Sequence, residues 1–286
     1  MFETIAGHAK QKQLLTKSIE SGKIAHAYVF AGPGSVGKRL IAKGFANALL
    51  GMSDEGRGMS FHPDLLEIAG DEPVKIEQIR ELIYKLSLQP YQAKYKIALI
   101  DNAENMTTEA QNALLKALEE PKSYTVMILV TEAFGKLLGT ITSRAQKLNF
   151  GLVRPADFQA LLPANLPECD VKQIAEFAAG RPGLAVRIAN DSDLRETLSE
   201  INNNLEIIKS QDLPAKLKLA YDLAELETVE LRQQFDFWLA RLEQDLLTEP
   251  GKLPARYISA VARSRKHLDQ NANSKLLLTN LMLQLN

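Results

Sequence analysis

The sequence predicts an α/β fold for its first 150 residues and an all-helical region after them. In the first part, short apolar runs alternate with helical patterns, which is typical of parallel strands joined by right-handed helical crossovers. Two of the runs, 97–100 and 126–130, are apolar at every position, as in strands covered by helices on both faces. After Phe150 strand patterns are absent, and the apolar residues follow the helical period.

The predicted strands are short and end at turn residues. We place them at residues 27–30, 65–68, 97–100, 126–130 and 147–150. The clearest amphipathic helix carries on one face Ile76, Ile79, Leu82, Ile83 and Leu86. A second helix ends at Pro121, and its inner stripe consists of Ala110, Ala113, Leu114, Ala117 and Leu118. We expect Thr108 and Gln111 to form the capping box of this second helix.

Composition and charge limit the class of protein. The 286 residues suffice for two domains or three small ones, and 45% apolar with 24% charged residues is the balance of a globular protein. The net charge is −1, with +2 in residues 1–150 and −3 in the remainder. Bulk charge therefore does not indicate a nucleic-acid binder.

The single cysteine, Cys169, excludes a disulfide within the chain and a cysteine-rich zinc site. The first residues lack the basic and apolar regions of a signal peptide. No run approaches the ~18 consecutive apolar residues of a membrane-spanning helix. We therefore expect a cytoplasmic protein that does not enter a membrane.

A glycine-rich segment connects the first predicted strand to a helix. It consists of Gly32, Pro33, Gly34, Ser35, Val36, Gly37 and Lys38. This strand–loop–helix context is the one that a phosphate-binding loop requires. Backbone N–H groups, the helix N-terminus and the lysine can all face phosphate oxygens there. A plain turn is the alternative, but it explains neither the lysine nor the flanking elements. The helix that follows carries at its apolar positions Leu40, Ile41, Phe45, Ala48 and Leu49.

Two positions differ from a working nucleotide hydrolase. The residue after Lys38 should be a Ser or Thr that ligates Mg²⁺, but it is Arg39, which has no acceptor atom and repels a cation. Asp101, at the end of the third predicted strand, is suited to support Mg²⁺, but the residue after it is Asn102. An amide cannot take a proton from the attacking water, and we expect Glu104 to point elsewhere. Hydrolysis is therefore not expected, while phosphate binding through Lys38 stays open.

The region after Phe150 divides into two helical parts. Residues 151–192 form a small unit broken by several prolines, and longer helices follow from 193. One of the longer helices has at helical spacing Leu231, Phe235, Trp238, Leu239, Leu242 and Leu246. The last stretch, 276–285, is expected to place its leucines on one side.

Several segments resemble the AAA+ subunits of bacterial clamp loaders. They are residues 24–28, 62–64, 76–80, 112–121 and 143–144. The sequence NALLKALEEP at 112–121 is the most specific of them, whereas the phosphate loop alone is not specific. Together they are most similar to the delta-prime type of DNA polymerase III subunit, with a dense resemblance over residues 1–150 and a weaker one beyond.

The resemblance implies an AAA+ P-loop core at 1–150, a small helical lid at 151–192 and an all-α collar at 193–286 that joins the subunits. It also implies several partners, which are motor ATPase and clamp-opening subunits, the sliding clamp and primer–template DNA. Delta-prime subunits often do not hydrolyse ATP, in agreement with Arg39 and Asn102. The resemblance further implies that Arg144 serves a neighbouring subunit in trans as an arginine finger.

Three features depart from the family pattern. Residues 50–61 lack the cysteines of its zinc module, Ala145 replaces a cysteine, and Gly183 stands where an active lid has an arginine. We therefore expect no zinc, and ATP or ADP binding only as a vestige. The alternatives are an active motor ATPase of the gamma/tau type and another AAA+ replication or repair factor. The chain's own ATPase is expected to be inactive, although the complex would be a DNA-directed DNA polymerase.

Overall fold

The computed structural model describes Phe2 and residues 5–52, 62–70, 72–164, 166–248, 255–270 and 272–285. The chain forms two compact units, Met1–Leu161 with Gly180–Leu184, and Leu162–Ala179 with Ala185–Asn286. Each has its own buried core. The division into three domains at 150 and 192 stays a prediction.

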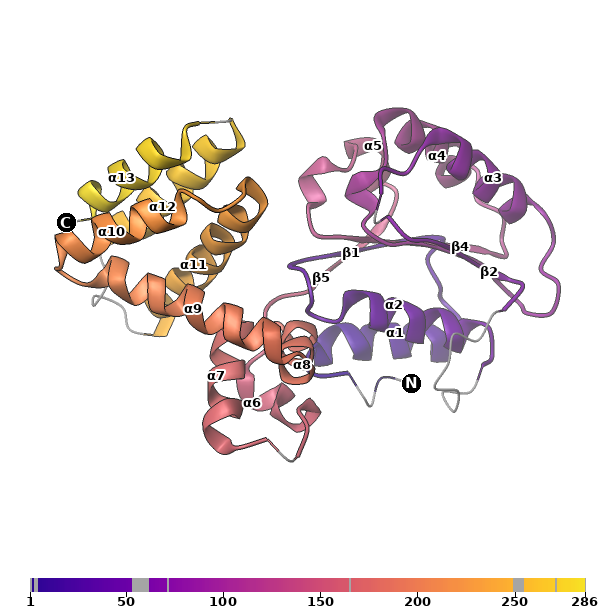
Figure 1. The fold of residues 1–286 in the computed structure, drawn as a ribbon. Coiled ribbons are helices and arrows are strands. Elements are labelled where there is room, and N and C mark those ends of the chain that lie inside the picture. Colours follow the sequence, from indigo (N-terminus) through magenta and orange to yellow (C-terminus); the bar gives the residue numbers. More distant parts are fainter. Residues whose placement is uncertain are drawn as a thin grey trace. The chain divides into compact units, whose positions relative to one another are not determined.

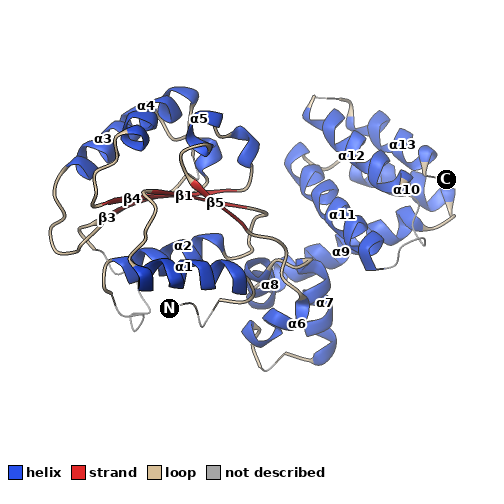
Figure 2. Ribbon diagram, turned by 180° about the vertical axis from the view of Figure 1, so that it is seen from behind, coloured by secondary structure: helices blue, strands red, loops and turns tan. Residues whose placement is uncertain are grey.

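The first unit is a five-stranded parallel sheet covered by helices (Figures 1 and 2). The strand order is β2-β3-β4-β1-β5. The strands are β1 (Ala27–Ala31), β2 (Leu65–Ile68), β3 (Lys96–Ile100), β4 (Thr125–Thr131) and β5 (Gln146–Asn149). The helices of eight or more residues are α1 (Ala9–Ser21), α2 (Lys38–Leu49), α3 (Ile76–Ser87) and α4 (Thr108–Glu119). The shorter elements are η1 (Ala103–Asn105), η2 (Phe134–Lys136), α5 (Gly139–Thr142), α6 (Pro155–Phe158) and η3 (Gln159–Leu161).

Successive residues of a strand point to opposite faces, so each central strand supplies two cores. Tyr28 and Phe30 of β1 pack with α1 and α2, while Val29 packs with α3 and α4 on the other face. The runs at 97–100 and 126–130 divide in the same way, and all their residues are buried. The prediction of a parallel sheet with helices on both faces is confirmed, and so are all five strands to within a residue or two.

Two details of the predicted helices are wrong. Thr107, and not Thr108, caps α4, because Thr107 has an extended backbone and its Oγ1 accepts the N–H of Ala110 at 3.2 Å. Gln111 is buried and reaches the chain after β4 instead, where its Oε1 accepts the N–H of Leu138 at 2.8 Å. In α2, Leu40 lies on the outer face and is 60% exposed, although the helix otherwise buries its apolar side as expected.

The second unit is helical. Its elements are α7 (Glu168–Ala178), α8 (Pro182–Asn190, whose first turn belongs to the first unit), α9 (Ser192–Lys209), α10 (Leu213–Leu223), α11 (Thr228–Thr248), α12 (Arg256–Asp269) and α13 (Ser274–Gln284). Helix α10 packs on α13, and α11 packs on α12. Trp238 of α11 is fully buried, and its indole N–H donates to the carbonyl of Ile201 at 3.0 Å.

The sequence pattern predicted that the leucines of 276–285 lie on one side of a helix. This prediction is wrong for α13. Leu278 and Leu281 are buried, whereas Leu276 and Leu283 are exposed. The leucines of this stretch are spaced around the helix, so only some of them reach its buried side. Among the described residues, no helix is long and apolar enough to span a membrane.

Candidate phosphate-binding loop and Arg144

The predicted phosphate loop lies between β1 and α2, at the carboxyl end of the sheet. Gly32 has a φ of 154°, and a methyl group on its Cα would lie 2.0 Å from the carbonyl oxygen of Phe150, so only glycine fits there. Ser35 has a φ of 58°, in the left-handed region. This tight path from Gly32 to Gly37 leads directly into the first turn of α2 at Lys38.

The loop is held by hydrogen bonds to its carbonyl groups. The ammonium group of Lys38 donates to the carbonyls of Gly32 at 2.8 Å and Pro33 at 2.6 Å. The N–H of Gly183 donates to the carbonyl of Ser35 at 2.8 Å. Nε2 of His8 lies 2.9 Å from the carbonyl of Val36. Burial lowers the pKa of His8, which favours a neutral ring whose Nε2–H is the donor.

Arg39 and Asp101 bind each other. A guanidinium nitrogen of Arg39 lies 3.2 Å from Oδ2 of Asp101, which stands at the end of β3. The side chain that replaces the Mg²⁺-binding hydroxyl therefore pairs with the carboxylate that would support Mg²⁺. Asn102 follows Asp101 and has a left-handed backbone. Arg39, Asp101 and Asn102 line one cavity, which has a volume of about 230 Å³. This cavity is smaller than the ~300–1,000 Å³ usual for small-molecule sites.

Two carboxylates near the loop were not predicted. Glu132 follows β4 and lines the cavity. The carboxylate of Glu104 accepts the backbone N–H of Glu132 at 3.1 Å, so Glu104 lies beside the site and does not point elsewhere. Burial lowers the pKa of Lys38, while the charges of Glu132, Glu104 and Asp101 act to raise it. Because β4 pairs with β1 in parallel, Ala31 opposite Thr131, the strand order would have placed Glu132 level with Gly32.

Arg144 lies away from the loop. It follows α5, which covers the face of the sheet opposite to α2 (Figure 2). Its guanidinium group is 3.0 Å from the carboxylate of Glu119 and donates to the carbonyl of Thr140 at 2.9 Å. The side chain remains 37% exposed. The predicted site residues thus form two places on the first unit, the loop with Arg39 and Asp101, and the separate Arg144.

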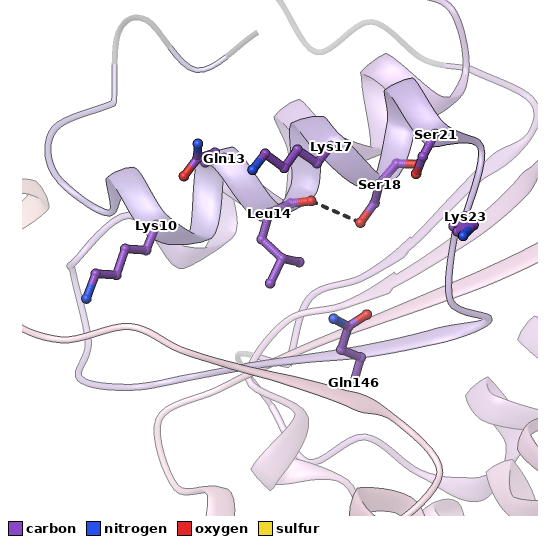
Figure 3. Close-up of a pocket in the computed structure, with 8 residues that line it drawn as sticks. All are labelled: Lys10, Gln13, Leu14, Lys17, Ser18, Ser21, Lys23 and Gln146. Atoms are coloured by element: carbon purple, nitrogen blue, oxygen red, sulfur yellow. Dashed lines mark hydrogen bonds between the residues drawn. The ribbon is translucent and has the colours of Figure 1, made fainter.

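A second hollow lies between α1 and β5 (Figure 3). The side chains of Lys10, Lys17 and Lys23 line it, with Gln13 and Gln146. All five are exposed. The hollow is thus lined by exposed lysine side chains, whereas the loop presents a fixed backbone.

The described residues contain no cluster of three or more His, Cys, Asp or Glu side chains that could hold a metal ion. Residues 53–61, which form most of the segment where the family carries its zinc cysteines, lie outside the described part of the chain.

Comparisons with known proteins agree with the fold and the motifs. A variant of Thermotoga maritima RuvB superposes with a TM-score of 0.50 at 17% identity, over 96% of this chain and 88% of that chain, consistent with the AAA+ fold. The subunit delta' of DNA polymerase III from Pseudomonas aeruginosa is 29% identical over 209 residues, 67% of this chain and 63% of the relative. The subunit gamma/tau from Mycobacterium bovis is 30% identical over 219 residues, 71% of this chain and 37% of the relative.

The matched region therefore spans less than two thirds of the length of either relative. The family described as "DNA polymerase III, delta subunit" matches residues 7–153, more than half of this chain. The match includes the whole sheet, the phosphate loop and Arg144. The chain belongs to this family and is delta-prime-like.

Proposed function

We propose that the chain is a clamp-loader subunit of the replicative DNA polymerase III that does not hydrolyse ATP. The ion pair between Arg39 and Asp101 carries this proposal. Arg39 stands in place of the hydroxyl that ligates Mg²⁺ in a P-loop ATPase, and it pairs with the carboxylate that would support the ion. Asn102 cannot act as the carboxylate base. The chain works in the cytoplasm beside motor and clamp-opening subunits, and helps to place the sliding clamp on primer–template DNA. An AAA+ core, a lid and a collar at 1–150, 151–192 and 193–286 would divide these tasks.

Arg144 contributes to this function in trans. Its exposed guanidinium follows a short helix and contacts Glu119, the carbonyl of Thr140 and the hydroxyl of Ser143. An approaching γ-phosphate can compete for it, because the fork of an arginine matches two phosphate oxygens. Arginine fingers of this kind raise the rate of GTPases by ~10³–10⁵. The chain thus completes the active site of a motor subunit while its own loop stays silent.

Reconstitution with the motor and clamp-opening subunits tests this role. Arg144→Ala should leave the chain folded and assembled, and should lower DNA-stimulated ATP hydrolysis by the complex at least ~10-fold. Arg144→Lys should also lower ATP hydrolysis by the complex, because one ammonium group cannot make the two-point contact of a guanidinium group. Arg154→Ala is the matched control, since Arg154 is an exposed arginine paired with Asp157 of the short helix that follows it. Wild-type hydrolysis and clamp loading by an assembled Arg144→Ala complex would exclude the trans-acting role.

A second candidate is an active motor ATPase. The intact glycine pattern of the loop and the similarity to a gamma/tau subunit favour it. Steady-state ATP turnover by the purified chain separates the two functions. A motor would turn over at about 1 per second or faster when stimulated, whereas the proposed subunit shows no turnover above background.

A further inference from the structure

The carboxylate of Glu132 lies directly against the centre of the phosphate loop. A methyl group placed on Gly34 would stand 2.5 Å from Oε1 of Glu132 and 2.8 Å from Oε2. Both oxygens are therefore in contact with the backbone of the loop at Gly34. In a phosphate loop this glycine lets the backbone approach an anionic ligand closely. Here the group that approaches it is an anion of the chain itself.

The charges around the loop do not favour a second anion. Lys38 and Arg39 supply two positive charges, whereas Asp101, Glu104 and Glu132 supply three negative ones. The net charge of the five groups is thus −1. Arg39 is already paired with Asp101, and Lys38 is bonded to two carbonyls of the loop. A nucleotide phosphate would meet the negative charge of Glu132, which lines the cavity.

We infer that the carboxylate of Glu132 takes the place of an anionic ligand at this loop and excludes nucleotide phosphates from it. The loop keeps its fold because His8, Gly183 and Lys38 bind its carbonyls. Loss of hydrolysis through Arg39 and Asn102 is then separate from loss of binding through Glu132. The exclusion is a property of the isolated chain and does not require assembly with other subunits.

Removing the charge of Glu132 should allow phosphate groups to bind at the loop. The probes are ADP and inorganic pyrophosphate, titrated into the full chain in a calorimeter. A unit charge about 5 Å away in a partly solvated site changes affinity by roughly 100-fold, so Glu132→Gln should bind both probes about that much more tightly than the wild type. Glu132→Ala should bind at least as tightly, because it removes the side chain as well. Binding should not require Mg²⁺, since Arg39 still stands in the metal's place.

Two controls locate the binding. Glu77→Gln removes an exposed carboxylate from the first turn of α3 and should bind like the wild type. Lys38→Met added to Glu132→Gln should abolish the gain, because the loop then lacks its cation. Binding that survives this double variant belongs to the lysine-lined hollow on α1 (Figure 3) and overturns the inference. Tight binding by the wild type, or no gain in either Glu132 variant, overturns it too. Far-UV circular dichroism confirms that each variant is folded.

Discussion

Asp64 illustrates how one residue of a family motif acts through structure. It is fully buried, and its carboxylate accepts the backbone N–H groups of Tyr91 at 2.6 Å, Gln92 at 2.8 Å and Ala93 at 3.0 Å. Burial acts to raise the pKa of Asp64, but the three N–H donors outweigh it, and the pKa lies below its ordinary value. Residues 62–64 are one of the segments that resemble the clamp-loader family. In the structure, Asp64 of this segment anchors the turn before β3.

Asp64→Asn should destabilise the first unit by about 2–4 kcal/mol, since the amide presents N–H groups where the backbone already donates. The folded pKa of Asp64 is below the unfolded one, so its stabilisation is complete above the unfolded pKa of ~3.9 and is lost as the pH falls through the folded value. Urea unfolding between pH 7 and pH 3 measures both effects. The difference between wild type and variant should shrink below about pH 4. A difference that stays constant with pH would mean that ionised Asp64 is not the stabilising form.

At the scale of elements, sequence patterns predicted well where strands and helices lie along the chain. They predicted poorly what the individual side chains of these elements contact. The strands followed from apolar runs, because a buried central strand has no other composition. Thr107 and Thr108 have identical side chains, and only the extended backbone of Thr107 decides which one caps α4. Leu40 and Leu276 fit the helical period but lie outside, since the period cannot tell how wide the covered face is.

The cap of α4 allows a matched pair of variants. Thr107→Ala removes the side-chain acceptor of the Ala110 N–H and should lower the free energy of unfolding by about 1 kcal/mol. Thr108→Ala changes an exposed residue in the first turn and should stay within about 0.5 kcal/mol of the wild type. Urea denaturation midpoints compare the two. Equal losses in both variants would contradict the assignment of Thr107 as the cap.

At the scale of the whole molecule, the sequence could predict those parts of the candidate site that are contiguous in the chain. The loop is contiguous, so Gly32 to Lys38 could be recognised from spacing alone. His8, Glu132 and Gly183 reach the loop from distant points of the chain. Their contribution depends on strand order and on backbone contacts, which a single sequence does not reveal. The missed residues are those that decide whether a recognisable loop can hold a ligand.

The second compact unit also joins parts that the predicted domain boundary separates. Phe177 of α7 packs edge-on against Phe237 of α11, with ring centroids 5.6 Å apart. Glu176 pairs with Arg241 at 3.3 Å. A chain ending at 192 would expose Phe177 and leave Glu176 without its partner. We therefore expect such a truncation to keep its sheet and to lose order in α7.

The two units should also unfold separately in the intact chain. The buried clusters on both faces of the sheet contain residues of the first unit alone, and Trp238, the only tryptophan, is buried in the second. Tryptophan fluorescence therefore reports the second unit, while hydrogen exchange of the β1 and β4 amides, read by mass spectrometry, reports the first. Measured against urea, the two probes should give different midpoints and slopes, because each unit exposes its own core. Asp64→Asn should move the midpoint of the strands and leave that of Trp238 in place. Coincident transitions, shifted together by the variant, would mean that the chain unfolds as one cooperative body.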